Sequence, residues 1–401
     1  MIEDLDIELK DIKAEAVLIT GSSTDGNPSL QYVCGVMIPR GGVYIKKVGM
    51  EPILIVGDID TANAEKGLVK NVYPFSKYNY YQLQKEYGKD GASKMYSNIL
   101  KELGVSKRIV LAGMIEAGRA IDLSRHLEGD GFEVIADGEL VERVRRTKSP
   151  HEIELIADVA RRTEDVVLKT WEMLQNTTVS GDTLQVNKRP MRVKDVKMFI
   201  NARLAEHELI ASIDTVFAPE ADGADPHNHG TPDRKIKTGV PIVFDIFPKN
   251  IHTGYCFDTT RTFVIGKAPQ EVHRMYDDVL QAQQTALDQI KENNSGKTIS
   301  ESVCDVLERK GYKTPRYYMK HPTIAMEEGY IHGLGHGVGL TIGESPYLSL
   351  VREYILKEGD VVTVEPGVYY PGKFGVRIED TVTVEKSVLK NFSTLIKELE
   401  L

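Results

Sequence analysis

Short apolar runs alternate with amphipathic stretches along the first third of the chain. In the runs, β-branched and other apolar residues cluster, a pattern typical of buried strands. The runs that predict strands are residues 15–20, 42–47, 52–57, 108–113 and 132–136. Apolar residues recur at every third or fourth position over 80–103 and 115–128, which predicts helices between the strands. This alternation of strands and helices indicates an α/β domain.

A stretch rich in charged residues ends this part of the chain and leads into a helix start. Ser149 is placed to cap the helix, Pro150 suits its first position, and Glu152 lies three residues after the cap, which completes a capping box. We therefore predict an N-terminal domain of residues 1–145 and a C-terminal domain of residues 146–401, the second opening with a long helix.

The remaining chain has a different pattern. Helical spacing of apolar residues recurs over 193–208, 269–291 and 299–310, and strands alternate with these helices from residue 241 onward. Glycine-punctuated strands dominate the last hundred residues. The C-terminal domain is therefore expected to be α+β.

Composition and charge exclude several classes of protein. The net charge of −9 disfavours a broad phosphate-binding surface, so we expect no nucleic acid as partner. The three cysteines, Cys34, Cys256 and Cys304, are scattered, which fits neither a disulfide framework nor a thiolate metal site and indicates a reducing compartment. The acidic N-terminal segment is unlike a signal peptide, and no apolar run approaches membrane-spanning length. We expect a cytoplasmic protein with no membrane contact.

Two predicted β-hairpins each carry a pair of acids within apolar strands. The first carries Asp245 and Asp258, and the second, which turns at Pro371, carries Glu365 and Glu379. A single acid at a strand end is usually a cap or an ion-pair partner. Four in one domain are costly to bury unless positive charge compensates them. Two divalent cations would cancel the four charges.

A glycine-rich run at 331–340 supplies a nitrogen ligand. A lone histidine there would more often be a hydrogen-bonded core residue, but together with the four acids His336 completes an oxygen-rich set with one nitrogen. Such a set suits Mn²⁺, Co²⁺ or Zn²⁺ better than Cu(I) or an iron–sulfur cluster. Two such metals share a water and lower its pKa, which is the chemistry of a hydrolase.

Several segments resemble the pita-bread metallopeptidases, the family of creatinase, prolidase, aminopeptidase P and methionine aminopeptidase. The branch most similar is that of Xaa-Pro dipeptidase (prolidase) and Xaa-Pro aminopeptidase (aminopeptidase P). The resemblance implies a C-terminal pita-bread fold preceded by an α/β creatinase-like domain, in a homodimer. The segments that carry it are residues 148–154, 254–263, 332–339, 364–367 and 375–380, with a weaker match at 30–35.

The resemblance also implies roles for individual residues. The family's five metal ligands fall on Asp245, Asp258, His336, Glu365 and Glu379. They would hold two divalent metal ions per subunit, Mn²⁺ or Co²⁺, with Zn²⁺ as the third option. Glu365 also falls on the residue that handles the proton of the nucleophilic water.

Further residues are implied on the substrate side of the site. His332 and His227 join Glu365 as the catalytic set, and His229 is the alternative to His227 because the spacing there departs by one residue. Arg377 is implied both to orient its neighbouring ligand and to face the substrate.

Two departures from the family pattern stand out. The segment from Asp245 to Asp258 is about two residues longer than usual, which a longer turn would absorb. Gly343 stands where the family has a histidine that contacts the scissile carbonyl, a loss worth about two to three orders of magnitude in rate, unless another histidine replaces it.

The function implied is cleavage of the peptide bond before proline in short peptides, by attack of a metal-bridging hydroxide. Because of Gly343, two alternatives stay open. One is a metal-dependent hydrolase or lyase acting on a non-peptide substrate. The other is a non-catalytic metal-binding paralogue, which retention of all five ligands disfavours.

Overall fold

The computed structural model describes residues 2–401, and the chain divides into two compact units between Arg145 and Arg146. The first unit is built on a mixed six-stranded sheet in the order β4-β3-β2-β1-β5-β6. The pairs β1–β2 and β2–β3 are antiparallel, and the pairs β3–β4, β1–β5 and β5–β6 are parallel. Its strands are β1 (Ala16–Gly21), β2 (Gly42–Lys47), β3 (Ile53–Val56), β4 (Asn71–Pro74), β5 (Arg108–Ala112) and β6 (Glu133–Ala136).

Helices cover this sheet, and its core is formed by the central strands. Leu18, Ile45 and Ile109 are fully or almost fully buried against α5 and α6 residues such as Ile99 and Leu127. The helices are α1 (Ile2–Asp11), α2 (Pro28–Cys34), α3 (Thr61–Ala64), α4 (Tyr80–Tyr87), α5 (Gly91–Glu102), α6 (Ala117–Gly129) and α7 (Leu140–Arg145). The α/β pattern predicted for this part of the chain is confirmed.

Two features of the first unit differ from the sequence prediction. The helix expected over 80–103 is broken into α4 and α5, because Gly88 adopts a φ of 58° that a continuous helix does not permit. Strand β4 was not predicted. Its residues are only half-buried and it ends in Pro74, so it lacks the apolar run that marks the inner strands.

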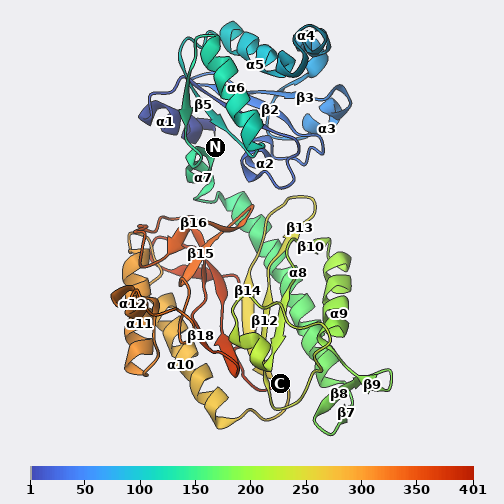
Figure 1. Cartoon of the computed structure of the whole chain (residues 1–401), viewed down its shortest axis with the longest axis vertical. Coiled ribbons are helices and arrows are strands. Elements are labelled where there is room, and N and C mark those ends of the chain that lie inside the picture. Colours follow the sequence, from blue (N-terminus) through green and yellow to red (C-terminus); the bar gives the residue numbers. More distant parts are fainter. Residues whose placement is uncertain (1) are drawn as a thin grey trace. The chain divides into compact units, whose positions relative to one another are not determined.

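The second unit opens with α8 (Pro150–Gln175), and the predicted capping box is confirmed. The Ser149 backbone N–H donates to Glu152 Oε2 (2.8 Å), and the Glu152 N–H donates to Ser149 Oγ (3.4 Å). In Figure 1, α8 and α9 lie on one side of the strands of this unit, and α10 and α11 lie on the other. The remaining helices are α9 (Val193–Glu206), α10 (Gln270–Leu287), α11 (Gly296–Arg309) and α12 (Pro315–Lys320).

Several small sheets lie between these helices. The largest has five strands in the order β16-β15-β17-β20-β21. Two have three strands, β11-β12-β14 and the outlying β7-β8-β9, and the pairs β18-β19 and β10-β13 complete the set. The bounds are β7 (Val179–Ser180), β8 (Thr183–Val186), β9 (Arg189–Pro190), β10 (Leu209–Ala211), β11 (Val216–Pro219), β12 (Pro241–Ile246), β13 (Pro248–Asn250), β14 (Thr259–Val264), β15 (Gly335–Val338), β16 (Ile342–Leu348), β17 (Val361–Val364), β18 (Gly367–Tyr370), β19 (Phe374–Arg377), β20 (Asp380–Val384) and β21 (Leu389–Asn391).

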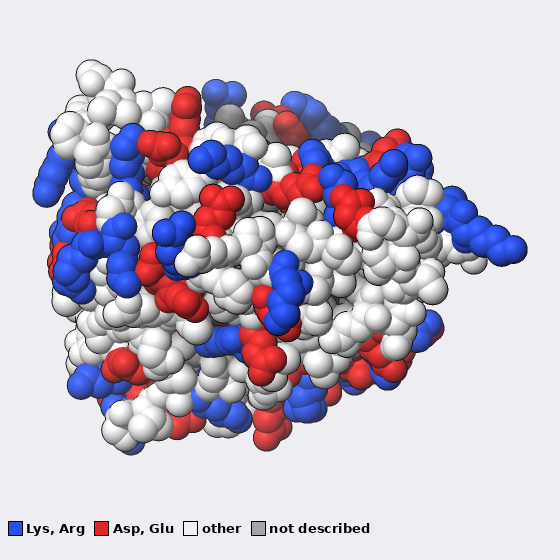
Figure 2. Space-filling model, turned by 90° about the horizontal axis from the view of Figure 1, so that it is seen from below, with Lys and Arg blue, Asp and Glu red and all other residues white. Residues whose placement is uncertain are grey.

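Charge is well mixed on the surface that Figure 2 displays. Lysine and arginine side chains alternate there with aspartate and glutamate, so this face has no broad region of one sign. Across residues 2–401, no helix combines the length and the apolar character that crossing a membrane requires.

A buried ion pair joins the start of the second unit to its β-structure. Lys148 Nζ donates to Glu344 Oε1 (2.7 Å) and to the Arg146 carbonyl (2.8 Å), and the side chains of Lys148 and Glu344 are each 1% exposed. Glu344 Oε2 accepts bonds from the backbone and hydroxyl of Thr341. The pair therefore fixes the turn that precedes β16 against the residues just before α8.

Replacing this lysine should destabilise the second unit. Lys148→Met leaves the Glu344 carboxylate buried without its cation, which typically costs about 3–5 kcal/mol. Urea unfolding followed by Trp171 fluorescence measures the effect, because Trp171 is the only tryptophan and is 5% exposed on α8. Lys169→Met, which removes an exposed lysine from the same helix, is the control. Equal effects of the two substitutions would contradict the prediction.

Candidate metal centre

The first predicted hairpin places its two acids on one face. Strands β12 and β14 are antiparallel, and Asp245 lies opposite Thr260. Asp258 precedes Thr260 by two residues and therefore points to the same side as Asp245. The longer connection between the acids is not a simple turn, because it contains β13, which pairs with β10.

The second hairpin brings its glutamates opposite each other. Val364 pairs with Asp380 and Gly367 with Arg377, which is one continuous register. In that register Glu365 faces Glu379, at the point where the ladder is interrupted between β17 and β18. The two glutamates therefore occupy opposite positions on the two strands.

The two hairpins are tied together at their acids. The Glu379 N–H donates to the Thr260 carbonyl (3.0 Å), and Thr260 Oγ1 donates to Glu379 Oε2 (2.7 Å). Thr381 Oγ1 donates to the Asp258 carbonyl (2.7 Å). These bonds fix the backbone of one hairpin against the carboxylates of the other.

His336, on β15, completes the group. Its Nε2 lies 3.4 Å from Glu365 Oε1 and 3.8 Å from Asp258 Oδ2. Asp258, His336 and Glu379 each offer one ligand atom, and these atoms lie within 4.8 Å of one another. The structure thus brings together four of the five residues that the sequence indicated as metal ligands, and the fifth, Asp245, is close enough that its charge raises the pKa of Asp258 and Glu379.

The other ring nitrogen of His336 bears on its ability to bind a metal. Nδ1 lies 3.2 Å from the Gly337 carbonyl and 3.2 Å from the Gly343 backbone nitrogen. A metal at Nε2 requires the proton to be on Nδ1, and the Gly337 carbonyl is then its acceptor. The Gly343 N–H, in contrast, can donate only to an unprotonated Nδ1, so the two contacts favour opposite tautomers and only the Gly337 carbonyl suits the metal-binding one.

The acids repel one another strongly when no cation is present. Burial, reinforced by Glu379, raises the pKa of Asp258 well above its usual value. Burial, reinforced by Glu365, does the same to the pKa of Glu379. The pKa of Glu365 is raised to about 7, mainly by burial. Arg377 pairs with Asp245, and its charge counteracts the rise in the pKa of Asp258 and Glu365, but carboxylates outnumber it in this group.

The donor atoms fit divalent cations. Asp245 Oδ1 and Asp258 Oδ1 are buried and have no hydrogen-bond partner among the described residues. Buried oxygens without partners are costly unless a cation or ordered water meets them. Carboxylate oxygens with one imidazole are a donor set that Mn²⁺, Co²⁺ and Zn²⁺ accept.

A buried chain of hydrogen bonds runs from this group to His332. Arg377, 4% exposed, donates through Nη2 to Asp245 Oδ2 (2.7 Å) and through Nη1 to Tyr369 Oη (2.8 Å). Tyr369 Oη lies 3.0 Å from His332 Nε2. Arg377 therefore bonds directly to Asp245 on the other hairpin. Its Nε also donates to Thr260 Oγ1 (3.3 Å), the hydroxyl that donates to Glu379.

His332 is held in its neutral form. Its Nδ1 lies 2.8 Å from the Gly333 carbonyl, so the proton on Nδ1 has an acceptor and Nε2 accepts from Tyr369. Burial, together with the charge of Arg377, lowers the pKa of His332 to about 3. Both ring nitrogens are thus engaged by the protein.

Tyr369 was not among the residues singled out from the sequence. A period of two around the Pro371 turn places it on the same face as Glu365, which was the available signal. Gly367 makes room for this contact. A Cβ there would lie 2.4 Å from Tyr369 Oη and 3.0 Å from His332 Nε2, so any side chain would separate the two rings.

The two candidate substrate-side histidines have different surroundings. His229 Nδ1 is bonded to the Asp214 carbonyl, and the His229 carbonyl accepts from Phe217 N–H. His227 is exposed, and its charge bears on the pKa of His332, which places it near the site.

Gly343 occupies a backbone conformation that excludes an ordinary side chain. Its φ is 82°, in the left-handed region, although no atom lies within 4 Å of where a Cβ would be. The position therefore has space for a side chain, but a histidine would be strained by the backbone.

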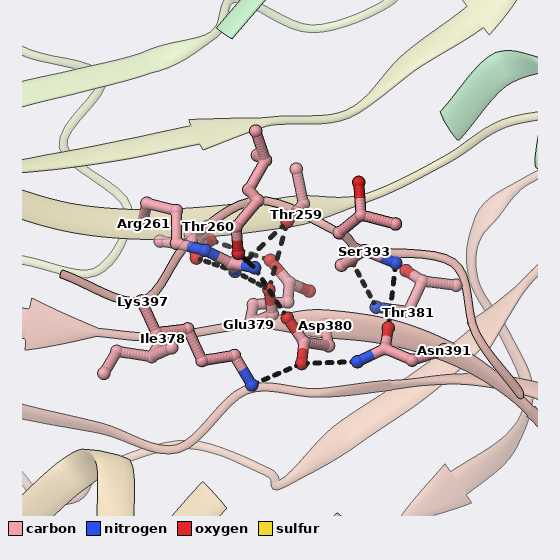
Figure 3. Close-up of polar contacts among 12 residues, drawn as sticks. Thr259, Thr260, Arg261, Ile378, Glu379, Asp380, Thr381, Asn391, Ser393 and Lys397 are labelled. Atoms are coloured by element: carbon pink, nitrogen blue, oxygen red, sulfur yellow. Dashed lines mark hydrogen bonds and ion pairs between the residues drawn. The ribbon is translucent and has the colours of Figure 1, made fainter. Parts of the chain in front are cut away.

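A second layer of charge lies behind Glu379 (Figure 3). Arg261 Nη2 donates to Asp380 Oδ1 (2.9 Å), and Lys397 Nζ and Asn391 Nδ2 donate to Asp380 Oδ2 (2.5 and 2.8 Å). Arg261 also donates to the Glu379 carbonyl (2.5 Å). Strand β20 is therefore anchored directly next to a candidate ligand.

Carboxylates gathered with one imidazole, on two hairpins joined by hydrogen bonds, define a site typical of metal-dependent hydrolases. Comparison with known proteins gives the family. The model of metallopeptidase family M24 matches residues 154–386. The chain belongs to metallopeptidase family M24, as the sequence motifs predicted.

Individual relatives agree with this assignment. The chain is 27% identical to the Xaa-Pro dipeptidase of Pyrococcus furiosus, over 90% of each chain. Among solved structures, it is similar to X-Pro aminopeptidase from Thermotoga maritima (TM-score 0.79, 24% identity, 98% of this chain and 100% of that one). It is also similar to Xaa-Pro dipeptidase from Bacillus anthracis (TM-score 0.80, 22% identity, 100% and 99%). The predicted α+β pita-bread fold is confirmed.

The raised pKa of Glu365 predicts how metal-free stability depends on pH. Its carboxyl binds a proton more tightly in the folded than in the unfolded chain, so its contribution to stability falls as pH rises from about 4.5 to about 7. Trp171-monitored urea unfolding in a chelator should show this fall, and Glu365→Gln should reduce it. Added Mn²⁺ should reverse it, because metal binds the deprotonated site. A Glu365→Gln profile identical to the parent profile would contradict the assignment.

Proposed function

We propose that this chain is a peptidase that cleaves the peptide bond preceding proline in short peptides, with the aid of two divalent metal ions. The observation that carries the proposal is the cluster of Asp258, Glu379 and His336, with Glu365 in contact with His336 and Asp245 close enough to raise the pKa of Asp258. One oxygen each of Asp245 and Asp258 is buried without a partner among the described residues. Relatives named Xaa-Pro dipeptidase that match most of the chain support the choice of substrate.

The metal ligands in this proposal are Asp245, Asp258, His336, Glu365 and Glu379. Mn²⁺ or Co²⁺ are the favoured ions and Zn²⁺ the third option, in accord with a donor set of oxygens and one nitrogen. When bound, such ions lower the pKa of water and polarise a carbonyl oxygen.

The protein's own groups divide the remaining tasks. Glu365 accepts the proton of the attacking water, in a buried position where its carboxylate is close to His336. Arg377 holds Asp245, and through Tyr369 it fixes the neutral ring of His332 at the edge of the site. His227 is the better candidate to contact the peptide, because His229 is bonded to the Asp214 carbonyl.

A second candidate function follows from Gly343. The position that would present a histidine to the scissile carbonyl has no side chain, and its backbone conformation opposes one. A metal-dependent hydrolase or lyase that acts on a non-peptide substrate is therefore the alternative.

Cellular setting and assembly are proposed on separate grounds. Cys34, Cys256 and Cys304 are all buried and free, which is compatible with the reducing environment of the cytoplasm. A homodimer is proposed by analogy with the family, and sedimentation would test it.

Loss of one candidate ligand should abolish metal binding without unfolding the chain. Asp258→Asn removes a charge that its neighbours repel, so metal-free protein should be at least as stable as the parent at pH 7.5. Chelated protein titrated with Mn²⁺ should lose tight binding. Asp195→Asn, whose parent carboxylate pairs with exposed Arg189, is the control and should bind normally. Full occupancy of the metal site by Mn²⁺ in Asp258→Asn would contradict the assignment of Asp258 as a ligand.

The activity itself is tested on two kinds of substrate. Chelated enzyme is reloaded with Mn²⁺, Co²⁺ or Zn²⁺ and assayed for free proline from Xaa-Pro dipeptides and for the N-terminal residue from longer Xaa-Pro peptides. Metal-dependent release is expected, and the preferred length decides between dipeptidase and aminopeptidase. If protein that holds two metals shows no turnover, the alternative function, action on a non-peptide substrate, is favoured.

A further inference from the structure

The β-ladder that carries two of the proposed ligands is interrupted at a proline. In the register that pairs Val364 with Asp380, Pro366 lies opposite Ile378. The Ile378 N–H donates to the Pro366 carbonyl (3.4 Å). Pro366 has no N–H and cannot donate in return, so the Ile378 carbonyl lacks a donor from the opposite strand.

A glutamine from a helix fills this gap. Gln283 lies on α10, which packs on β17, β18 and β19, and its side chain is fully buried. Its Nε2 donates to the Ile378 carbonyl (3.1 Å) and also to the Val364 carbonyl (3.0 Å). An amide nitrogen has two hydrogens, and both are used.

These two carbonyls have a particular place in the chain. Val364 immediately precedes Glu365, and Ile378 immediately precedes Glu379. One amide group therefore holds the backbone directly before both glutamates, which face each other across the interruption. The bridge thus joins the two strands at the residues that immediately precede the two glutamates.

Packing alone does not account for a glutamine at this position. Gln283 Oε1 is buried and has no partner among the described residues, which is costly for the fold. An apolar side chain of similar volume would avoid that cost. What it would lose is the pair of donors to the two ligand-bearing strands.

We propose that Gln283 is a positioning residue of the metal centre, which sets the separation of Glu365 and Glu379 by bridging the carbonyls that precede them. The inference rests on the proposed role of these glutamates as metal ligands. Gln283 itself touches neither metal nor substrate, so its effect is expected first in metal affinity and coordination.

The test compares two glutamines that each donate two bonds. Gln283→Met removes the bridge and keeps the side-chain volume. Gln289→Met is the matched control, because Gln289 Nε2 donates to the Thr285 carbonyl (2.7 Å) and to Ser302 Oγ (2.8 Å), away from the ligand strands. Gln283→Asn, a milder change that keeps the amide but shortens its reach, provides a second variant if the methionine variant does not fold.

Chelated proteins are titrated with Mn²⁺ and with Co²⁺, and Trp171 fluorescence verifies that each is folded. We expect Gln283→Met to bind roughly 10- to 100-fold more weakly than the parent, the usual effect of losing a residue that orients ligands. Gln289→Met should bind as the parent does. The visible spectrum of bound Co²⁺, which reports coordination geometry, should change only in the Gln283 variants.

Each outcome has a definite meaning. Equal affinities and equal Co²⁺ spectra in the parent and the Gln283 variants overturn the positioning role while leaving the ligand assignment intact. Equal weakening by Gln283→Met and Gln289→Met also overturns it, because the effect would then be one of general stability. A parent protein that binds no metal overturns the proposed function, and the positioning role with it.

Discussion

Repulsion among four carboxylates, two of them buried and two largely buried, is the constraint on which the C-terminal unit depends. Asp258, Glu365 and Glu379 are each held in surroundings that raise their pKa, and Arg377 is the one buried cation in contact with the group through Asp245. A fold that gathers such charges must hold them by its backbone. The bonds between the hairpins, the Gln283 bridge and the Asp380 cluster provide that rigidity. These hydrogen bonds hold the acids in place against their mutual repulsion.

The outline of this site was predictable because each acid interrupts an apolar strand, and a period of two assigns it to a face. Asp245, for example, lies opposite Thr260, two residues beyond Asp258, as the hairpin pattern implies. The direction of Arg377 was not predictable. Its guanidinium reaches the opposite hairpin, and spacing along one strand carries no information about a contact between separate hairpins.

Contacts between distant elements explain the other omissions as well. Gln283 lies in a helix whose apolar spacing was recognised, but the value of its amide depends on Pro366, which is far away in sequence. In the first unit, the strands were predicted where apolar residues form a run, even at the exposed edge strand β6. They were missed at β4, where a half-buried edge gives little hydrophobic signal, and the break at Gly88 depends on a local backbone conformation that periodicity does not report.

The unbroken register across the Pro366 interruption sets limits on how this chain could vary in length. An insertion or deletion of one residue in the β18–β19 hairpin would move Glu379 out of line with Glu365 and turn its side chain to the other face. The connection between Asp245 and Asp258 is different, because it leaves the hairpin and pairs with β10 before returning. A change of length in the first connection therefore need not alter the pairing of β12 with β14, while the second connection is fixed by the register of the strands it joins.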